Sequence, residues 1–271
     1  MKPLPYLQES FKTLLLMALM TSCVHKPNPA DLLSQGTWID LTWPFDEQSV
    51  YWPTNVHFSH DTVFEGINDK GYFYSSYKFA AEEHGGTHFD APVHFAEGGK
   101  SVDQVPVDRL VGPGILLDVS IKAGQDPDYL ISISDFEEWE KEHGRIPDEA
   151  IVLVYTGFSR FYPDKEKYTG TTLTGQEGVD NLHFPGLHPD AASWLATERM
   201  IKAFGLDTPS IDYGQSKDFM THRILFANEV TAYENVAHLE KLPPKGFWII
   251  ALPMMIRGGS GAPLRIVAFL P

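Results

Sequence analysis

Three histidines and one aspartate crowd into a single short segment, EHGGTHFDAPVHF at residues 83–95. Imidazole nitrogens combined with a carboxylate oxygen form a ligand set that suits Zn²⁺, Mn²⁺ or Fe²⁺, and three protein ligands leave positions on the ion for a reactive water. A single histidine beside a Gly-Gly turn often only bonds to backbone groups. For the group as a whole, we predict that His84, His88 and Asp90 bind a divalent metal.

The backbone of this segment must bend for these side chains to meet. The glycine pair after His84 disfavours a regular helix and allows a turn that brings His84 and His88 together. If the chain is extended beyond that turn, His88 and Asp90 point to the same side, because they are two residues apart. Pro92 limits any helix that follows. The segment is therefore expected in a loop after a strand at Phe73–Ala81.

The rest of the sequence offers little for covalent catalysis. No Gly-x-Ser-x-Gly nucleophile elbow occurs in the chain, and its single cysteine, Cys23, lies in an N-terminal segment that has the layout of an export signal. A bound divalent metal lowers the pKa of its water from about 15.7 towards about 7 and polarises a carbonyl. The residues therefore predict a metal-activated water rather than a covalent nucleophile.

The same segment resembles the signature of a known family. Residues 84–95 match His-Gly-Gly-Thr-His-x-Asp-x-Pro-x-His-Phe at every specified position. This is the signature of the metal-dependent cyclase family, which includes bacterial-type kynurenine formamidase and isatin hydrolase. The likeness continues through GLDTPSID at 205–212, His222 with Glu234 twelve residues on, and GAPLR at 261–265. Together these motifs span about residues 36–271.

The resemblance implies a fuller ligand set than the segment alone. It assigns His84, His88 and Asp90 to a first ion, with Asp90 able to bridge to a second ion. His222 and Glu234 match the remaining ligands of that second ion, although from the residues alone they are an ordinary histidine and a solvated carboxylate. The expected cofactor is Zn²⁺ or Mn²⁺, with one or two ions per subunit.

His94 matches the family position assigned to acid/base catalysis rather than to ligation. An imidazole with an unperturbed pKa of about 6.5 can take a proton from water and return it to a departing nitrogen. We therefore predict His94 as the catalytic residue.

Substrate contacts are predicted from aromatic and turn residues. Trp52 and an aromatic group at Phe64 and 72–74 could line a pocket for a flat aromatic amide, although aromatic side chains more often lie in a core or a subunit interface. Ser210 is assigned to substrate binding or to support of the ligands, and Asp212 either orients a ligand or caps a helix. The glycine-rich residues 258–261 lack the Lys-Ser/Thr of a P-loop and are predicted as a turn.

Alternating strand and helix patterns predict a single mixed α/β domain, and the resemblance implies the swivelling β/β/α type. Short apolar or alternating runs predict strands at Trp38–Thr42, Phe73–Ala81, Ile115–Val119, Ile151–Tyr155, Ala203–Leu206, Phe247–Leu252 and Arg265–Leu270. Helices are predicted at Asp135–His143, Asp190–Met200 and Asn235–Lys241, the first opened by a capping box of Ser134 with Glu137. The irregular order argues against a doubly wound sheet.

The N-terminus has the features of a bacterial lipoprotein. A basic residue and an apolar run precede small residues and Cys23, in a stretch too short to span a bilayer. We predict a signal peptide at residues 1–22, lipidation of Cys23, a tether at 23–35 and the catalytic domain at 36–271. This predicts an extracytoplasmic protein anchored to the cell membrane, on the periplasmic side of the outer membrane.

Composition excludes several classes of function. The 271 residues carry 21 Lys plus Arg against 36 Asp plus Glu, a formal charge of −15, which argues against a nucleic-acid partner. One cysteine excludes a disulfide framework and multi-cysteine metal sites. The expected partner is a small-molecule substrate, and the resemblance implies a homodimer or homotetramer.

Three functions fit these observations. The first is hydrolysis of a C–N amide bond in a small, aromatic or cyclic amide, as in the arylformamidase and isatin-hydrolysing members. The second is cyclisation or dehydration of a polyketide-like intermediate. The third is a lipoprotein that captures metal or solute without turnover. His94 separates the third from the others, because capture does not need a histidine that stays off the metal.

Overall fold

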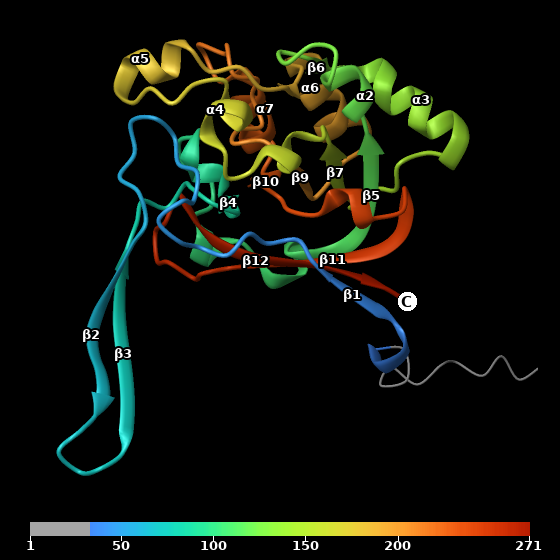
Figure 1. The fold of residues 1–271 in the computed structure, drawn as a ribbon. Coiled ribbons are helices and arrows are strands. Elements are labelled where there is room, and N and C mark those ends of the chain that lie inside the picture. Colours follow the sequence, from blue (N-terminus) through green and yellow to red (C-terminus); the bar gives the residue numbers. More distant parts are fainter. Residues whose placement is uncertain (1–32) are drawn as a thin grey trace, which may run out of the picture. The chain divides into compact units, whose positions relative to one another are not determined.

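The computed structural model describes residues 33–271 (Figure 1). Gly36–Pro271 forms one compact unit, and of the other unit, Met1–Gln35, only residues 33–35 are described. The predicted signal peptide, Cys23 and most of the predicted tether lie outside the described residues. Within residues 33–271, no helix has the length and apolar character needed to cross a membrane.

Eight strands form one mixed sheet that closes on itself. Their order is β1-β12-β11-β5-β7-β9-β10-β4, and β4 also pairs with β12, which closes the sheet into a barrel-like core. Strands β5, β7, β9 and β10 are parallel, and the other pairings are antiparallel. The strands are β1 (Thr37–Asp40), β4 (His88–Asp90), β5 (Val111–Asp118), β7 (Ile151–Tyr155), β9 (Ala203–Leu206), β10 (Thr231–Glu234), β11 (Lys245–Pro253) and β12 (Gly261–Leu270). The predicted mixed α/β class is confirmed.

Helices cover the outer face of the parallel strands (Figure 1). The helices that pack there are α3 (Ile133–His143), α6 (Pro189–Glu198) and α7 (Met220–Ala227). The shorter helices α2 (Ser120–Ala123), α4 (Lys165–Thr169) and α5 (Gly175–Asp180) lie in the connecting segments. Short 3-10 helices and two-residue strands complete the connections: η1 (Pro92–His94), η2 (Val102–Gln104), η3 (Val107–Arg109), η4 (Phe158–Phe161), η5 (Leu239–Lys241), β6 (Leu130–Ile131) and β8 (Gly186–Leu187).

Alternation along the parallel strands builds two hydrophobic cores. In β7, Ile151 and Leu153 pack inside the barrel with Phe89 and Ile249. Val152 and Val154 pack instead between the sheet and the helices. Because both faces of such a strand are buried, its sequence is a continuous run of apolar residues. The strands predicted at 115–119, 151–155 and 203–206 all lie in this part of the sheet, and each is found in the structure.

Two helix predictions need correction. The helix predicted at Asn235–Lys241 is wrong, because Asn235 and His238 have φ of 52° and 57°, so only the short turn η5 forms. The predicted capping box of Ser134 with Glu137 is also wrong. Helix α3 begins two residues earlier, and its box joins Ser132 to Asp135.

A separate two-stranded hairpin, β2 (Ser59–Ile67) with β3 (Phe73–Ala80), extends away from the barrel (Figure 1). The sequence predicts β3 but not β2. The strand β2 contains a glycine and a bulge at Val63, which interrupts its alternation.

Buried Asp207 ties the ends of two parallel strands together. Its carboxylate accepts hydrogen bonds from the backbone N–H groups of Thr156, Gly157 and Ser159 and from the Thr156 and Ser159 hydroxyls, at 2.7–3.1 Å. These donors lie just after β7, and Asp207 lies just after β9. The loop that starts at Asp207 leads to Ser210 and Asp212, so this network fixes the approach to the candidate site.

Replacing Asp207 by alanine leaves five buried donors without their acceptor. We expect Asp207→Ala to lower the free energy of unfolding by about 2–4 kcal/mol, measured by denaturant titration. The matched control is Asp118→Ala, because the Asp118 carboxylate is exposed and accepts a bond from the Ser120 N–H. A similar small loss in both variants would contradict a stabilising role for the Asp207 network.

Candidate metal centre

The register between β4 and β10 places two acids and a histidine on one surface of the barrel. Phe89 and Tyr233 are paired across the two strands and point into the barrel core. Their neighbours alternate to the other face, so His88, Asp90 and Glu234 point outward. Glu234 lies directly opposite His88 in the register. The prediction that His88 and Asp90 share a side is confirmed, although the segment is a short strand rather than a loop.

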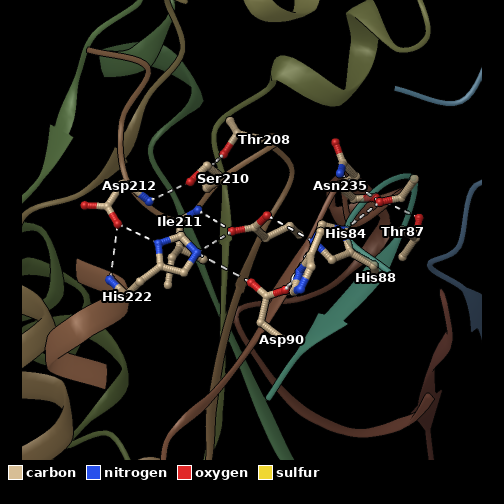
Figure 2. A network of polar contacts seen from close by, with 12 residues as sticks. His84, Thr87, His88, Asp90, Thr208, Ser210, Ile211, Asp212, His222 and Asn235 are labelled. Carbon is tan, nitrogen blue, oxygen red and sulfur yellow. Dashed lines mark hydrogen bonds and ion pairs between the residues drawn. The ribbon is translucent and has the colours of Figure 1, made fainter. Parts of the chain in front are cut away.

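Helix α7 supplies the fourth side chain from outside the barrel (Figure 2). His222 Nε2 lies 3.2 Å from Glu234 Oε1 and 3.5 Å from Asp90 Oδ2. Its Nδ1 donates to Asp212 Oδ2 at 2.6 Å. The same carboxylate accepts the backbone N–H groups of Thr221 and His222 in the first turn of α7. Asp212 therefore both caps the helix and orients the histidine, so the two predicted roles coexist.

His84 reaches the cluster from the turn before β4. Its Nδ1 lies 2.7 Å from Asp90 Oδ1, and its Nε2 lies 2.9 Å from Ser260 Oγ. The Ser260 hydroxyl in turn donates to Glu83 Oε2 at 2.8 Å. Close approach of the ring requires Gly261, because a side chain there would clash with His84. The predicted turn at 258–261 thus also carries a partner for His84.

Two overlapping groups of ligand atoms result. The side chains of His84, His88 and Asp90 form one group, and those of Asp90, His222 and Glu234 form the other; within each, the ligand atoms lie within 4.8 Å of one another. Asp90 belongs to both, because Oδ1 faces His84 and His88 while Oδ2 faces His222. The structure thus brings together all five predicted ligands.

The donors fit a divalent cation. Each of the three histidines turns one ring nitrogen towards the acidic cluster and bonds through the other to a group outside the two ligand sets. His88 Nδ1 donates to Gly86 O at 3.0 Å, while His222 and His84 use Asp212 and Ser260. Metal-binding histidines characteristically use one nitrogen in this way. Within residues 33–271, His88 Nε2 and Asp90 Oδ2 are buried without a hydrogen-bond partner. Buried polar atoms rarely lack a partner, so these two favour a bound ion.

The electrostatics of the cluster also favour a bound cation. Burial by itself lowers the pKa of His88, but Asp90 and Glu234 outweigh it and raise the pKa of His88 to about 10. Burial raises the pKa of Asp90, and the neighbouring His88 and His84 outweigh it and hold that pKa well below its usual range. The site therefore holds positive charge strongly. A cation and protons compete for it, because ligating histidines must be neutral.

His94 lies beside this cluster but belongs to neither group of ligand atoms. Its ring stacks on the ring of His84 with centroids 3.8 Å apart, and within the described part of the chain it makes no side-chain hydrogen bond. Burial lowers the pKa of His94 to about 4, so the ring is neutral at pH 7. The geometry agrees with the predicted division between His94 and the ligands.

A cavity of about 290 Å³ opens over the metal ligands. Its walls include the predicted Trp52 and Ser210, together with His94, Phe95 and Phe219. Trp52 and Phe219 are in contact, with ring centroids 6.0 Å apart and ring planes tilted by 59°. Pockets for small ligands combine such apolar walls with a few polar groups.

The other predicted aromatic group does not contribute to this cavity. Phe64, Tyr72, Phe73 and Tyr74 lie on the β2–β3 hairpin, where they are 38–61% exposed. None of them lines the cavity over the candidate metal ligands. The aromatic cluster that suggested a pocket wall lies on a hairpin instead.

Several site residues carry no clear signal in the sequence. Phe219 lies just before α7, a helix that the sequence analysis missed, and its backbone adopts φ of 51°. Asn235 donates to Gly86 O at 2.7 Å and so supports the turn between His84 and His88. Glu83 and Asn235 adjoin predicted ligands in sequence, and that adjacency was the available signal.

Comparison with known proteins identifies the family of this chain. A family model described as "Putative cyclase" matches residues 39–213. An isatin hydrolase of Roseibium aggregatum is 32% identical over 197 residues, which cover 70% of this chain and 72% of that protein. A kynurenine formamidase of Bacillus mycoides is 27% identical over 238 residues, which cover 87% and 98% of the two chains.

A solved structure is similar over most of the chain. Isatin hydrolase A from Ralstonia solanacearum superposes with a TM-score of 0.81 at 28% identity, covering 91% of this chain and 99% of that one. The fold and the sequence relationship therefore agree over most of the chain. The chain therefore belongs to the cyclase family, as the motif at residues 84–95 implied.

Proposed function

We propose that this protein hydrolyses a C–N amide bond in a small aromatic or cyclic amide. The observation that carries the proposal is the joint presence, in one cavity, of two overlapping ligand groups and a neutral histidine outside them. The related isatin hydrolase and kynurenine formamidases support the same class of reaction. A site built only for metal capture has no need of His94.

The five side chains of His84, His88, Asp90, His222 and Glu234 would hold one or two ions. A divalent ion there supplies Lewis-acid polarisation of the amide carbonyl and a nucleophilic water at neutral pH. Zn²⁺ and Mn²⁺ are the proposed ions, since imidazole with carboxylate ligands suits both.

His94 is proposed to move the proton. Its neutral ring would accept a proton from the attacking water, because His94 lines the cavity and is uncharged at pH 7. A conjugate acid with a low pKa gives that proton up readily, so His94 returns it to the leaving nitrogen as the C–N bond breaks. Its contact with the His84 ring keeps His94 beside the ligands throughout.

The cavity walls are proposed to select a flat, apolar substrate. Trp52 and Phe219 would form an apolar wall against it, and Ser210 would offer a hydroxyl. A volume of about 290 Å³ lies at the small end of ligand pockets, which span about 300–1,000 Å³. This favours a substrate of one or two rings over a long acyl chain.

The function is tested with a panel of N-formylkynurenine, isatin and simple aryl amides, each with and without chelator. We expect chelator-sensitive hydrolysis of at least one amide or lactam. Absence of turnover on the whole panel by metal-loaded protein would refute the amidase and leave the polyketide-type cyclase or dehydratase and the capture protein.

We also propose export and lipidation at Cys23, on the sequence pattern alone. An exported member would act on a substrate met outside the inner membrane, which makes formylkynurenine less suitable than an exogenous cyclic amide. Mass spectrometry of the native N-terminus tests this, and an intact segment 1–22 would contradict it.

Removing the shared ligand is expected to remove the metal. In Asp90→Ala both ligand groups lose a member, so we expect metal content by elemental analysis to fall below one-tenth of the wild-type value. The melting temperature should then no longer rise with added Zn²⁺ or Mn²⁺. The control is Asp69→Ala, since Asp69 is exposed at the hairpin tip. Full metal content in Asp90→Ala would contradict the assignment.

Removing the proton carrier is expected to spare the metal. In His94→Ala we expect unchanged metal content and melting temperature but a kcat lower by about 10²–10⁴-fold, the usual contribution of a general base. His143→Ala serves as the matched control, because His143 ends α3 and lies outside the cavity. A metal-replete His94→Ala enzyme with normal turnover would exclude the proposed role.

A further inference from the structure

A chain of hydrogen bonds extends from His84 away from the ligand groups. His84 Nε2 lies 2.9 Å from Ser260 Oγ, and Ser260 Oγ lies 2.8 Å from Glu83 Oε2. Glu83 is adjacent to His84 in sequence, whereas Ser260 comes 176 positions after it, just before β12. We call Glu83 and Ser260 the outer pair.

The direction of each bond in this chain follows from the groups that surround Glu83. Its Oε2 also accepts the backbone N–H groups of Ser260 at 2.8 Å and of Gly261 at 3.1 Å. An oxygen that receives two N–H groups on its lone pairs does not itself carry a proton, so Glu83 Oε2 is an acceptor in its third contact as well. The Ser260 hydroxyl therefore donates its proton to Glu83.

This direction determines which nitrogen of His84 carries the hydrogen. A serine hydroxyl has one proton, and that of Ser260 points to Glu83. Towards His84, Ser260 Oγ can therefore only accept, so the hydrogen of His84 is on Nε2. In a neutral imidazole the other nitrogen then has a lone pair. This atom is His84 Nδ1, which lies 2.7 Å from Asp90 Oδ1 on the side of the ligand groups.

We propose that Glu83 and Ser260 are positioning residues, which hold His84 in the tautomer that binds the first ion through Nδ1. The outer pair touches His84 from the side opposite the ligand groups, so it acts only through this ring. The proposal rests on the proposed metal centre. It does not rest on the proposed substrate or reaction, because binding of an ion is measured without turnover.

The other two histidines are turned the opposite way. His88 bonds to Gly86 O through Nδ1 and faces Glu234 with Nε2. His222 bonds to Asp212 through Nδ1 and also faces Glu234 with Nε2. The centre would therefore combine one Nδ1 ligand with two Nε2 ligands, and this asymmetry gives the proposal a signature of its own.

The backbone around Ser260 holds its hydroxyl in place. The Ser260 carbonyl oxygen accepts the N–H of Ala91, the residue after β4, at 2.9 Å. The carbonyl oxygen of Gly259 accepts the N–H of Val102 at 3.0 Å. The turn that carries Ser260 is thus tied to the strand that carries two of the predicted ligands.

Without the outer pair, His84 loses the contact that selects its tautomer. A ring with its hydrogen on Nδ1 presents an N–H group to the ligand site, and a ligating nitrogen must be free of its proton. Partners that orient a metal-binding histidine typically contribute about 10–100-fold to metal affinity. We therefore expect the outer pair to affect the affinity for the first ion.

Nitrogen NMR of the wild type loaded with Zn²⁺ tests the tautomer directly. In protein with ¹⁵N-labelled histidine, two-bond ¹H–¹⁵N correlations distinguish a protonated ring nitrogen from one bound to zinc. We expect zinc on Nδ1 and hydrogen on Nε2 for His84, and the reverse for His88 and His222. Zinc on Nε2 of His84 would overturn the proposal. A wild type that binds no Zn²⁺ would overturn the metal centre and this proposal together, whereas absent turnover by zinc-loaded protein would leave the proposal standing.

Calorimetric titration with Zn²⁺ tests the role of Ser260. In Ser260→Ala we expect the affinity for the first ion to fall about 10–100-fold, and the NMR spectrum to include His84 with its hydrogen on Nδ1. The matched control is Ser193→Ala, since Ser193 is exposed on α6. Wild-type affinity together with the wild-type tautomer in Ser260→Ala would refute the positioning role.

Two substitutions at Glu83 separate its role as an acceptor from its charge. Glu83→Gln keeps an oxygen that accepts from Ser260, so we expect the wild-type tautomer and a smaller loss of affinity than in Glu83→Ala. In Glu83→Ala the Ser260 hydroxyl is free to donate to His84 Nε2, so we expect a loss as large as in Ser260→Ala. Equal losses in the two Glu83 variants would assign the effect to charge and contradict the proposal. Circular dichroism and the melting temperature establish that each variant is folded.

Discussion

The pairing of β4 with both β10 and β12 is the interaction on which the candidate site depends. Three residues of β4 close the barrel, and Phe89 in their middle anchors the strand in the core. Because side chains alternate along a strand, the same anchoring turns His88 and Asp90 to the outer face. A slip of one residue would bury both polar side chains in the barrel and remove them from Glu234.

Closure of the barrel also concentrates buried charge. Asp90, Glu234 and Asp212 are each less than 5% exposed and surround His222. Buried carboxylates are costly unless a positive charge or hydrogen-bond donors compensate them. Protons on the histidines provide this compensation in the absence of an ion, as the raised pKa of His88 indicates. A divalent cation does the same while leaving the imidazoles neutral, which couples metal binding to the stability of this region.

The two sides of the barrel differ in what covers their outer faces. On the side of the parallel strands, helices cover the outer face, exclude water and bring His222 and Asp212 to the strands. On the side of β11 and β12, Trp248 and Leu252 lie on the outer face and are each 49% exposed.

The sequence by itself determined the family, the mixed α/β class, most barrel strands and the identity of the clustered ligands. The class and the strands follow from local signals, because buried parallel strands are apolar runs. His84, His88 and Asp90 follow from the contiguous motif at residues 84–95, whereas His222 and Glu234 entered only through the resemblance to the family. Only the tertiary structure decided that Asp90 faces both ligand groups and that Ser260 and Asp212 orient the histidines. It also decided that Phe73 lies on the exposed β2–β3 hairpin rather than in the cavity. Such facts depend on strand register and on contacts between residues more than a hundred positions apart, as between His84 and Ser260. Local propensity carries no information about those distances, because they are set by how the barrel closes.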